Sequence, residues 1–268
     1  MKIAAALLVY FCCVTLPARA QSDSVACSAI IMRDARTALS GALYVLSAPA
    51  RWDGKDWGWA GVTVGATGGA ALLDHDLRSM MQRNVSASAD HWADATVVYG
   101  DGFFAVGLSV GLYGTGLLIH DPWLRETAVL AGTAIIVSTV VTRVVKPIVG
   151  RARPYVNAGN GAFRMFSLDD AYNSFPSGHT VAAFSLSSVL AARINHPLAT
   201  IGLYSLATLT ALSRLYTDEH WFSDVVFGGI FAASVGRSLV LWREADNREV
   251  HSLHIVPSPN RIVLVYNL

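Results

Sequence analysis

The stretch TAVLAGTAIIVSTVVTRVV, residues 127–145, decides the fold, because Arg143 is its one charged side chain. A helix that spans a bilayer needs about 20 mostly apolar residues. Further apolar stretches with few or no charges are residues 102–119, 180–192, 198–212 and 225–242. Several of them are shorter than a full span, so hydropathy alone allows either a membrane bundle or a buried helical bundle.

The composition favours lipid as the solvent. Of 268 residues, 53% are hydrophobic and 15% are charged, whereas ordinary soluble domains carry about 25% charged residues. The mean hydropathy is +0.43. The 20 basic and 19 acidic side chains give a net charge of +1, which excludes a strongly basic nucleic-acid binder and an acidic disordered tail.

Tryptophans flank the predicted spans. Trp123, Trp221 and Trp242 stand at span ends, where tryptophan anchors helices at the membrane–water interface.

Residues 253–256 and 262–266 flank a Pro-Ser-Pro-Asn segment, which predicts a hairpin. We therefore expect an all-α, membrane-embedded helical bundle with a small C-terminal β-hairpin.

The N-terminus has the layout of a secretory signal peptide. Lys2 precedes the apolar run 3–16, and an Ala-Arg-Ala site ends at Ala20. With the signal removed, Cys27 is the remaining cysteine, so no internal disulfide is expected. The predicted organisation is a signal peptide over 1–20, an N-terminal helical region over 21–100, a helical core over 101–245 and the hairpin over 246–268.

Polar residues gather in three clusters at the ends of the spans. These clusters are Lys146 with Arg151, Arg153 and Pro154, then Pro176-Ser177-Gly178-His179, and then Ser213-Arg214 with His220 and Asp224. Because consecutive spans alternate in direction, all three clusters fall on one side of the bundle. We therefore expect them to form one site.

These residues suit a phosphoryl oxyanion. Arginine and lysine in surplus over carboxylate bind such a group, and a helix starting near Ser177 and Gly178 offers backbone N–H groups to an anion. His220 and Asp224 are four residues apart, so on a helical turn the carboxylate can hold one ring nitrogen and leave the other as a nucleophile. His179, on a separate helix, can then act as a general acid.

The three clusters resemble, residue for residue, the three-part motif of the type 2 phosphatidic acid phosphatase and vanadium haloperoxidase superfamily. The matching segments are Lys146-x6-Arg153-Pro154, Pro176-Ser177-Gly178-His179 and Ser213-Arg214-x5-His220-x3-Asp224. The match runs from about residue 127 to residue 242, and it says least about the N-terminal third. It implies a helical bundle of the phosphatidic acid phosphatase/haloperoxidase type.

The resemblance also implies an activity, namely metal-independent hydrolysis of a mono- or diphosphate ester, above all of a membrane lipid, through a phosphohistidine. By similarity, His220 attacks phosphorus, Asp224 orients His220, and His179 protonates the leaving oxygen. The implied phosphate-binding residues are Lys146, Arg153, Ser177, Gly178 and Arg214. The expected partners are the phosphorylated lipid and the bilayer, with no cofactor, no metal and no nucleic acid.

Three alternatives share these motifs. A soluble exported acid phosphatase should be less hydrophobic than this chain, and vanadate-dependent haloperoxidases are usually much longer. A catalytically inactive, lipid-binding membrane protein would be attractive if His179 or His220 were missing, and both are present.

With a cleaved signal and five crossings from residue 102 onward, the site faces the periplasm or exterior. The segment 59–73 is then an embedded or interfacial helix.

Other polar residues have weaker signals. Asp74-His75-Asp76 is expected to be a solvated turn. Arg151 fits either a contact behind the phosphate-binding residues or a solvated charge. The apolar loop 155–175 joins two motifs over the site, which favours a lid or a contact with an acyl chain over inert packing.

Overall fold

The computed structural model describes residues 20–250, 253–258 and 261–266. The predicted signal peptide lies outside the described residues except for Ala20. The chain divides into two compact units, Met1–Thr37 and Ala38–Leu268, and the fold described below is that of the second.

Helices make up most of the described chain. The α-helices are α2 (Ala20–Leu46), α3 (Gly54–Ala71), α4 (Asp74–Arg83), α5 (Ala87–Val97), α6 (Gly102–Leu118), α7 (Pro122–Val149), α8 (Gly178–Ile194), α9 (Pro197–Tyr216) and α10 (Phe222–Val250). Short 3-10 helices are η1 (Ala48–Arg51), η2 (Val98–Gly100), η3 (Pro154–Val156) and η4 (Asp170–Tyr172).

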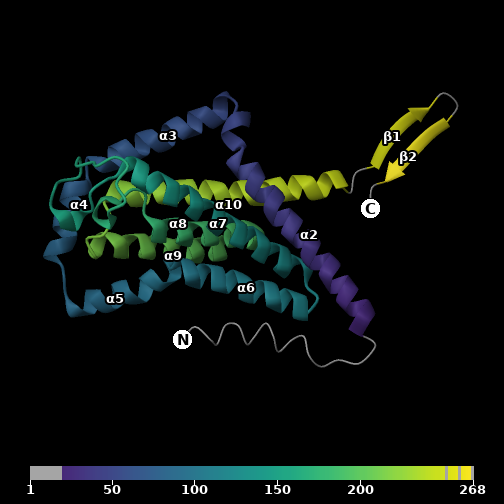
Figure 1. The fold of residues 1–268 in the computed structure, drawn as a ribbon, viewed down its shortest axis with the longest axis horizontal. Coiled ribbons are helices and arrows are strands. Elements are labelled where there is room, and N and C mark those ends of the chain that lie inside the picture. The colour runs from purple at the N-terminus through teal and green to yellow at the C-terminus, as the bar shows by residue number, and fades with distance from the viewer. Residues whose placement is uncertain (1–19, 251–252, 259–260, 267–268) are drawn as a thin grey trace. The chain divides into compact units, whose positions relative to one another are not determined.

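Helix α8 is the centre of a bundle with α7, α9 and α10 (Figure 1). Its small residues let its neighbours approach closely, as in helix packing within membranes. Gly236 of α10 lies so close to α8 that an added Cβ would stand 2.0 Å from Ser188 Oγ. The core consists of aliphatic side chains and alanines of α6, α7, α8 and α10, among them Leu130, Ile135, Leu186 and Leu239.

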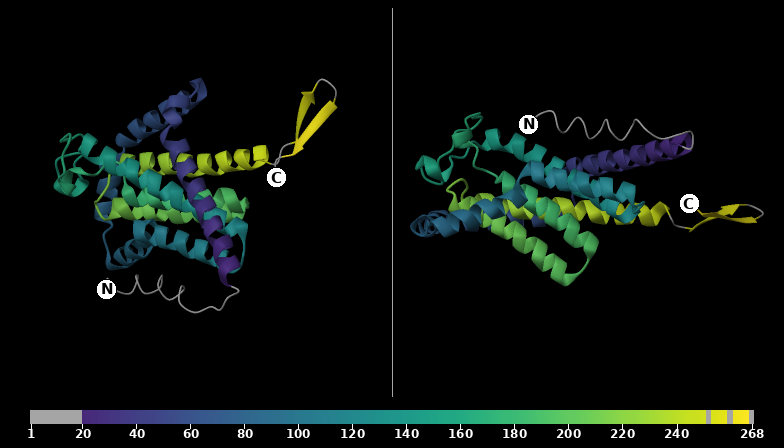
Figure 2. Two further views of the ribbon diagram at one scale, coloured as in Figure 1. Left: turned by 45° about the vertical axis from the view of Figure 1, so that its right-hand side comes forward. Right: turned by 90° about the horizontal axis from the view of Figure 1, so that it is seen from below.

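Local sequence signals set the ends of the site-bearing helices. Asp121 caps α7 by accepting hydrogen bonds from the N–H groups of Trp123 and Leu124, and Pro122 occupies the first turn. Gly150 ends α7 in the left-handed region, with φ of 61°. At this end of the bundle the α7–α8 loop begins, and both views in Figure 2 show the loop at that end.

Among the residues that the structure describes, three helices are long and apolar enough to cross a membrane: α7, α9 and residues 222–247 of α10. The pair formed by residues 87–100 and 102–118 adds a fourth if its 51° bend lies within one span. Helices α3 and α8 do not meet this test, although residues 180–192 were expected to span. Helix α8 buries Ser185, Ser187 and Ser188 against its neighbours, so it carries polar residues without exposing them to lipid.

The predicted C-terminal hairpin is present. Strands β1 (Leu253–Ser258) and β2 (Arg261–Tyr266) pair antiparallel, with Leu253 opposite Tyr266 and Ser258 opposite Arg261. The fold is therefore the expected helical one with a small hairpin.

One tryptophan interpretation is wrong. Trp221 is 2% exposed, and its indole N–H donates to the carbonyl oxygen of Ala152 at 2.8 Å. It therefore does not anchor the chain at an interface. Trp123 is 44% exposed, as expected of an interface residue.

Candidate active site

A cavity of about 740 Å³ lies where the three motif-bearing segments meet. Six of the eight predicted site residues line it: Lys146, Arg153, Gly178, His179, Arg214 and His220. The other two, Ser177 and Asp224, are fully buried behind its wall. The rest of the wall includes apolar side chains of α6 and α7, such as Phe103, Val106 and Val140.

The ends of helices deliver these residues to the cavity. Lys146 stands in the last turn of α7, His179 in the first turn of α8, and Arg214 in the last turn of α9. His220 lies in the connection between α9 and α10, and Asp224 in the first turn of α10. Because the helices pack side by side, residues up to 78 positions apart share one end of the bundle.

His220 is 4% exposed, and its Nδ1 lies 3.8 Å from Oδ2 of Asp224. That separation is an ion-pair distance and is too long for a hydrogen bond. Within the described residues, Nδ1 has no hydrogen-bond partner. Since Nδ1 faces the carboxylate, Nε2 is the nitrogen left for a substrate.

Asp224 is held by three donors besides facing His220. Its Oδ1 accepts from Arg151 Nη1 at 2.5 Å. Its Oδ2 accepts from Ser174 Oγ at 2.5 Å and from the N–H of Trp221 at 2.9 Å. A buried carboxylate needs such partners, because burying an unpaired charge is expensive.

The prediction that Asp74-His75-Asp76 is a solvated turn is wrong for Asp74. It begins α4, is 1% exposed, and pairs with Arg151 Nη2 at 2.7 Å. His75 and Asp76 are the solvated members of the triplet, with 83% and 84% of their side chains exposed. Arg151, 4% exposed, is not a solvated charge either. It joins Asp74 to Asp224.

Two of the three cations predicted to bind phosphate have carboxylates beside them. Arg153 pairs with Glu219 and, at 2.9 Å, with Asp170, while Arg214 Nη2 lies 3.8 Å from Glu219 Oε2. Lys146 Nζ donates to the carbonyl oxygen of Asn173. Glu219 therefore stands between two arginines that the resemblance assigns to phosphate.

Ser177 and Gly178 differ in what they present. The N–H of Ser177 donates to the carbonyl oxygen of Asp224 at 3.3 Å, so that group is already used in packing α10 against the start of α8. Gly178 lines the cavity at the N-terminus of α8, where the helix dipole favours an anion. Their assignment to phosphate binding stays a prediction.

Both histidines have lowered pKa values. Burial is the main cause for each: it lowers the pKa of His220 to about 3 and that of His179 to about 4. The positive charge of Lys146 lowers both further, and Arg214 adds to the effect on His179. Both imidazoles are therefore neutral at pH 7 in this site. That state suits a nucleophile, whereas a general acid must first gain a proton.

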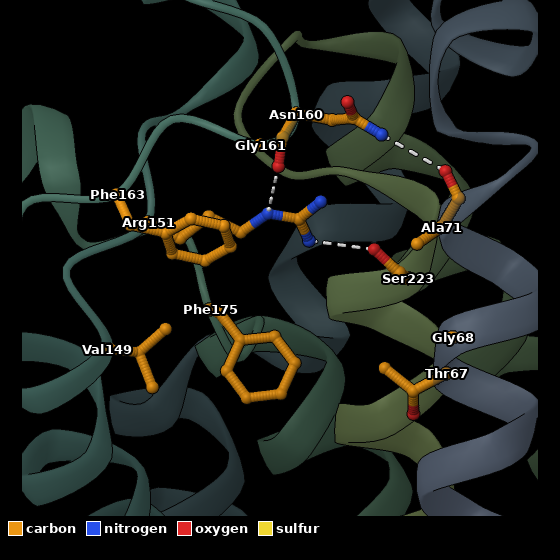
Figure 3. A pocket seen from close by; sticks show the side chains of 10 residues that line it. All are labelled: Thr67, Gly68, Ala71, Val149, Arg151, Asn160, Gly161, Phe163, Phe175 and Ser223. Atoms are coloured by element: carbon orange, nitrogen blue, oxygen red, sulfur yellow. Dashed lines mark hydrogen bonds between the residues drawn. The ribbon is translucent and has the colours of Figure 1, made fainter.

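A second cavity, of about 390 Å³, lies beside Arg151 (Figure 3). Thr67, Gly68 and Ala71 of α3 form part of its wall, and Phe163 and Phe175 form another part. Arg151 uses its guanidinium for Asp74, Asp224, Ser223 and the carbonyl oxygen of Asn160, so no free charge points into this cavity.

No group of three or more His, Cys, Asp or Glu side chains suited to a metal ion occurs within the described residues. Sequence reasoning missed Asp74 and Glu219 as neighbours of the site. Glu219 had a signal, since it directly precedes His220. Asp74 had none, because its partners are 77 and 149 residues away.

The bundle and its motifs are those of a membrane-embedded helical fold of the phosphatidic acid phosphatase type. Residues 127–248, a little under half of the chain, match the family model of the PAP2 superfamily, in agreement with the resemblance of the three motifs.

Relatives and solved structures agree with that family. A lipid A 1-phosphatase of Porphyromonas gingivalis is 37% identical over 84 residues, covering 30% of this chain and 19% of that protein. One from Rhizobium etli is 32% identical over 108 residues, 37% of this chain and 45% of that protein. This chain therefore spans less than half the length of these curated relatives.

Two crystal structures share the fold. LpxE of Aquifex aeolicus has a TM-score of 0.52 at 21% identity, covering 63% of this chain and 95% of that one. The transmembrane PAP2 type phosphatidylglycerolphosphate phosphatase of Bacillus subtilis has a TM-score of 0.53 at 17% identity, covering 78% and 96%.

Proposed function

We propose that this protein is a membrane lipid phosphatase that hydrolyses a phosphate mono- or diphosphate ester. One observation carries the proposal: the cavity is lined both by cations and two histidines of the motifs and by apolar side chains of α6 and α7. A lipid phosphate has the same division, with a charged head and an apolar tail. A water-soluble phosphate would leave the apolar wall unused.

The residues support hydrolysis in two steps. In the first, Nε2 of His220 forms a bond to phosphorus while the bond from phosphorus to the leaving oxygen breaks, and His179 gives that oxygen a proton. In the second, His179 takes a proton from water, the water oxygen attacks phosphorus, and the N–P bond breaks to release phosphate. Lys146, Arg153 and Arg214 neutralise the phosphoryl oxygens throughout.

The names of the relatives make the 1-phosphate of lipid A the first substrate to test. Phosphatidylglycerophosphate, phosphatidate and polyprenyl diphosphate follow, because each also joins a phosphate to a lipid tail. The hydrophobicity of the chain and its three candidate spans favour this class over a soluble acid phosphatase.

We place the site on the periplasmic or outer side of the membrane. The predicted signal peptide supports this orientation, because two crossings by α6 and α7 then precede Lys146, and two more by α8 and α9 precede His220. A lipid exposed on that leaflet would then reach the cavity without leaving the bilayer.

Phosphate release from a panel of substrates in detergent tests the proposal. The panel contains lipid A 1-phosphate, phosphatidylglycerophosphate, undecaprenyl diphosphate and p-nitrophenyl phosphate. We expect at least one lipid to have a far higher kcat/KM than the soluble ester. Equal turnover of the soluble ester would favour a non-specific acid phosphatase.

The control for the chemistry is a pair of histidine variants. His220→Ala should abolish phosphate release, because it removes the nucleophile, while His75→Ala should retain it, because His75 is a solvent-exposed residue away from the cavity. Both variants should behave alike in size-exclusion chromatography. Substantial turnover by His220→Ala would refute the nucleophile assignment.

A further inference from the structure

We propose that one face of α4, carrying Asp74 and Arg78, positions the His220–Asp224 pair for the reaction. This inference rests on the proposed function. It assigns a role to the N-terminal third of the chain, on which the sequence motifs are silent. Neither residue lines the 740 Å³ cavity, so both act through other residues.

Asp74 fastens the start of α10. Its Oδ1 accepts the backbone N–H of Ser223 at 2.8 Å, and its Oδ2 accepts the hydroxyl of Ser223 at 2.9 Å. Ser223 is the neighbour of Asp224. The carboxylate of Asp74 therefore fixes both the backbone and the side chain of the residue that precedes the catalytic aspartate.

Asp74 also reaches Asp224 through Arg151. The guanidinium gives Nη2 to Asp74 at 2.7 Å and Nη1 to Asp224 at 2.5 Å, and Nη1 is also 2.7 Å from Ser223 Oγ. Arg151 is thus shared by two buried carboxylates. Without the charge of Asp74, Asp224 would be the one carboxylate paired with Arg151, and the orientation of that carboxylate toward His220 would change.

Arg78 holds the other side of the nucleophile. Its Nε and Nη2 bind both oxygens of Asp218 at 2.7 Å each, in the bidentate geometry that only arginine provides. Asp218 has a φ of 58°, so the segment just before His220 includes a left-handed turn. The guanidinium also lies 5.6 Å from the ring centre of Trp221.

The spacing on α4 explains how one helix makes both contacts. Residues 74, 78 and 82 are four apart and therefore share a face. Gln82 continues the pattern by donating to the carbonyl oxygen of Tyr216 at 3.0 Å. This face contacts the chain before and after His220 through polar side chains, whereas an ordinary packing helix would use apolar ones.

The experiment compares matched substitutions on α4. Asp74→Asn removes a buried charge with little change of shape, and Asp76→Asn makes the same change at an exposed position two residues away. Arg78→Lys and the exposed Arg83→Lys form the second pair. Each purified, monodisperse variant is assayed for kcat and KM on the best lipid substrate, and for the rate at which diethyl pyrocarbonate modifies His220, read by mass spectrometry.

We expect Asp74→Asn and Arg78→Lys to lower kcat about tenfold or more, because small misplacement of a reacting group is costly, with KM unchanged. The modification rate of His220 should change several-fold, while that of exposed His91 stays constant. The two controls should match the wild type. Unchanged kcat and unchanged His220 reactivity in both test variants would overturn the proposal.

The two readouts separate this inference from the proposed function. If the wild type releases no phosphate from any lipid, the proposed function fails, but a change in His220 reactivity still supports the role of α4. If Asp74→Asn yields no monodisperse protein, the pair Arg78→Lys and Arg83→Lys decides.

Discussion

His179 and His220 both have lowered pKa values, but the proposed reaction needs them in opposite protonation states. His220 must be neutral to attack, and its low pKa provides that state without any change. His179 must be protonated to act as an acid, yet burial and Arg214 keep it neutral in this site. The charge that can restore its proton is the substrate's own phosphate, since a nearby anion raises the pKa of an imidazole.

The pKa of His179 is therefore expected to rise from about 4 when an oxyanion binds. As pH rises through this raised value, His179 loses its proton and turnover falls. An NMR titration of labelled histidine with and without orthovanadate measures the shift, and the basic limb of the kcat profile should follow the vanadate-bound value. A pKa that stays the same or falls with vanadate would contradict the role of His179 as the acid.

Glu219 is a second residue whose charge affects the cavity. It pairs with Arg153 and lies 3.8 Å from Arg214 Nη2, so a phosphate that takes both arginines competes with this carboxylate. Glu219→Gln should tighten competitive inhibition by inorganic phosphate about two- to fivefold, the range of a partly exposed ion pair. Glu244→Gln, on the exposed side of α10, is the control. Weaker inhibition in Glu219→Gln would mean that the carboxylate supports the site instead.

At the scale of elements, the connection from α7 to α8 depends on one close approach. A Cβ on Gly150 would lie 1.8 Å from the carbonyl oxygen of Arg164, and the N–H of Arg164 donates back to the carbonyl oxygen of Gly150 at 2.6 Å. The expected lid over 155–175 is a loop whose Met165, Phe166 and Leu168 are exposed, and Leu168 lines the 740 Å³ cavity.

Gly150→Ala should therefore destabilise the protein more than Gly159→Ala. Both glycines have positive φ, 61° and 87°, so alanine is strained at both positions. Gly159 has no atom within 4 Å of an added Cβ. The difference between the two losses of stability therefore measures the steric clash at Gly150, which we expect to be about 2 kcal/mol. Thermal unfolding in detergent measures it, and equal melting temperatures would contradict the account.

At the scale of the whole molecule, the bundle presents a polar site to one side of the membrane. Glu126, near the start of α7, pairs with Arg193, near the end of α8, at 2.9 Å. This contact is expected of antiparallel neighbouring helices. The α7–α8 loop and the α8–α9 connection therefore lie at opposite ends of the bundle.

Reporter fusions test which side is which. A reporter that is active only after export should give signal when placed next to Tyr155 and none in the connection 193–197. The physical reason is the parity of crossings after an exported N-terminus. Signal from 193–197 alone would reverse the orientation.

Much of the site could be predicted from the sequence by itself. The apolar stretches and the spacing of Arg214, His220 and Asp224 are local patterns, which can be recognised without knowing how the helices pack. They determined a helical membrane protein with a small hairpin and brought the motif residues to one end.

The tertiary structure decided which charges are buried. Asp74 in a polar triplet and Trp221 at a span end have the sequence signals of exposed residues, yet both are among the least exposed in the bundle. The free energy of burying a charge depends on its partners, and those of Asp74 are Arg151 and Ser223. Such distant pairings arise only when the helices pack, so no local pattern could reveal them.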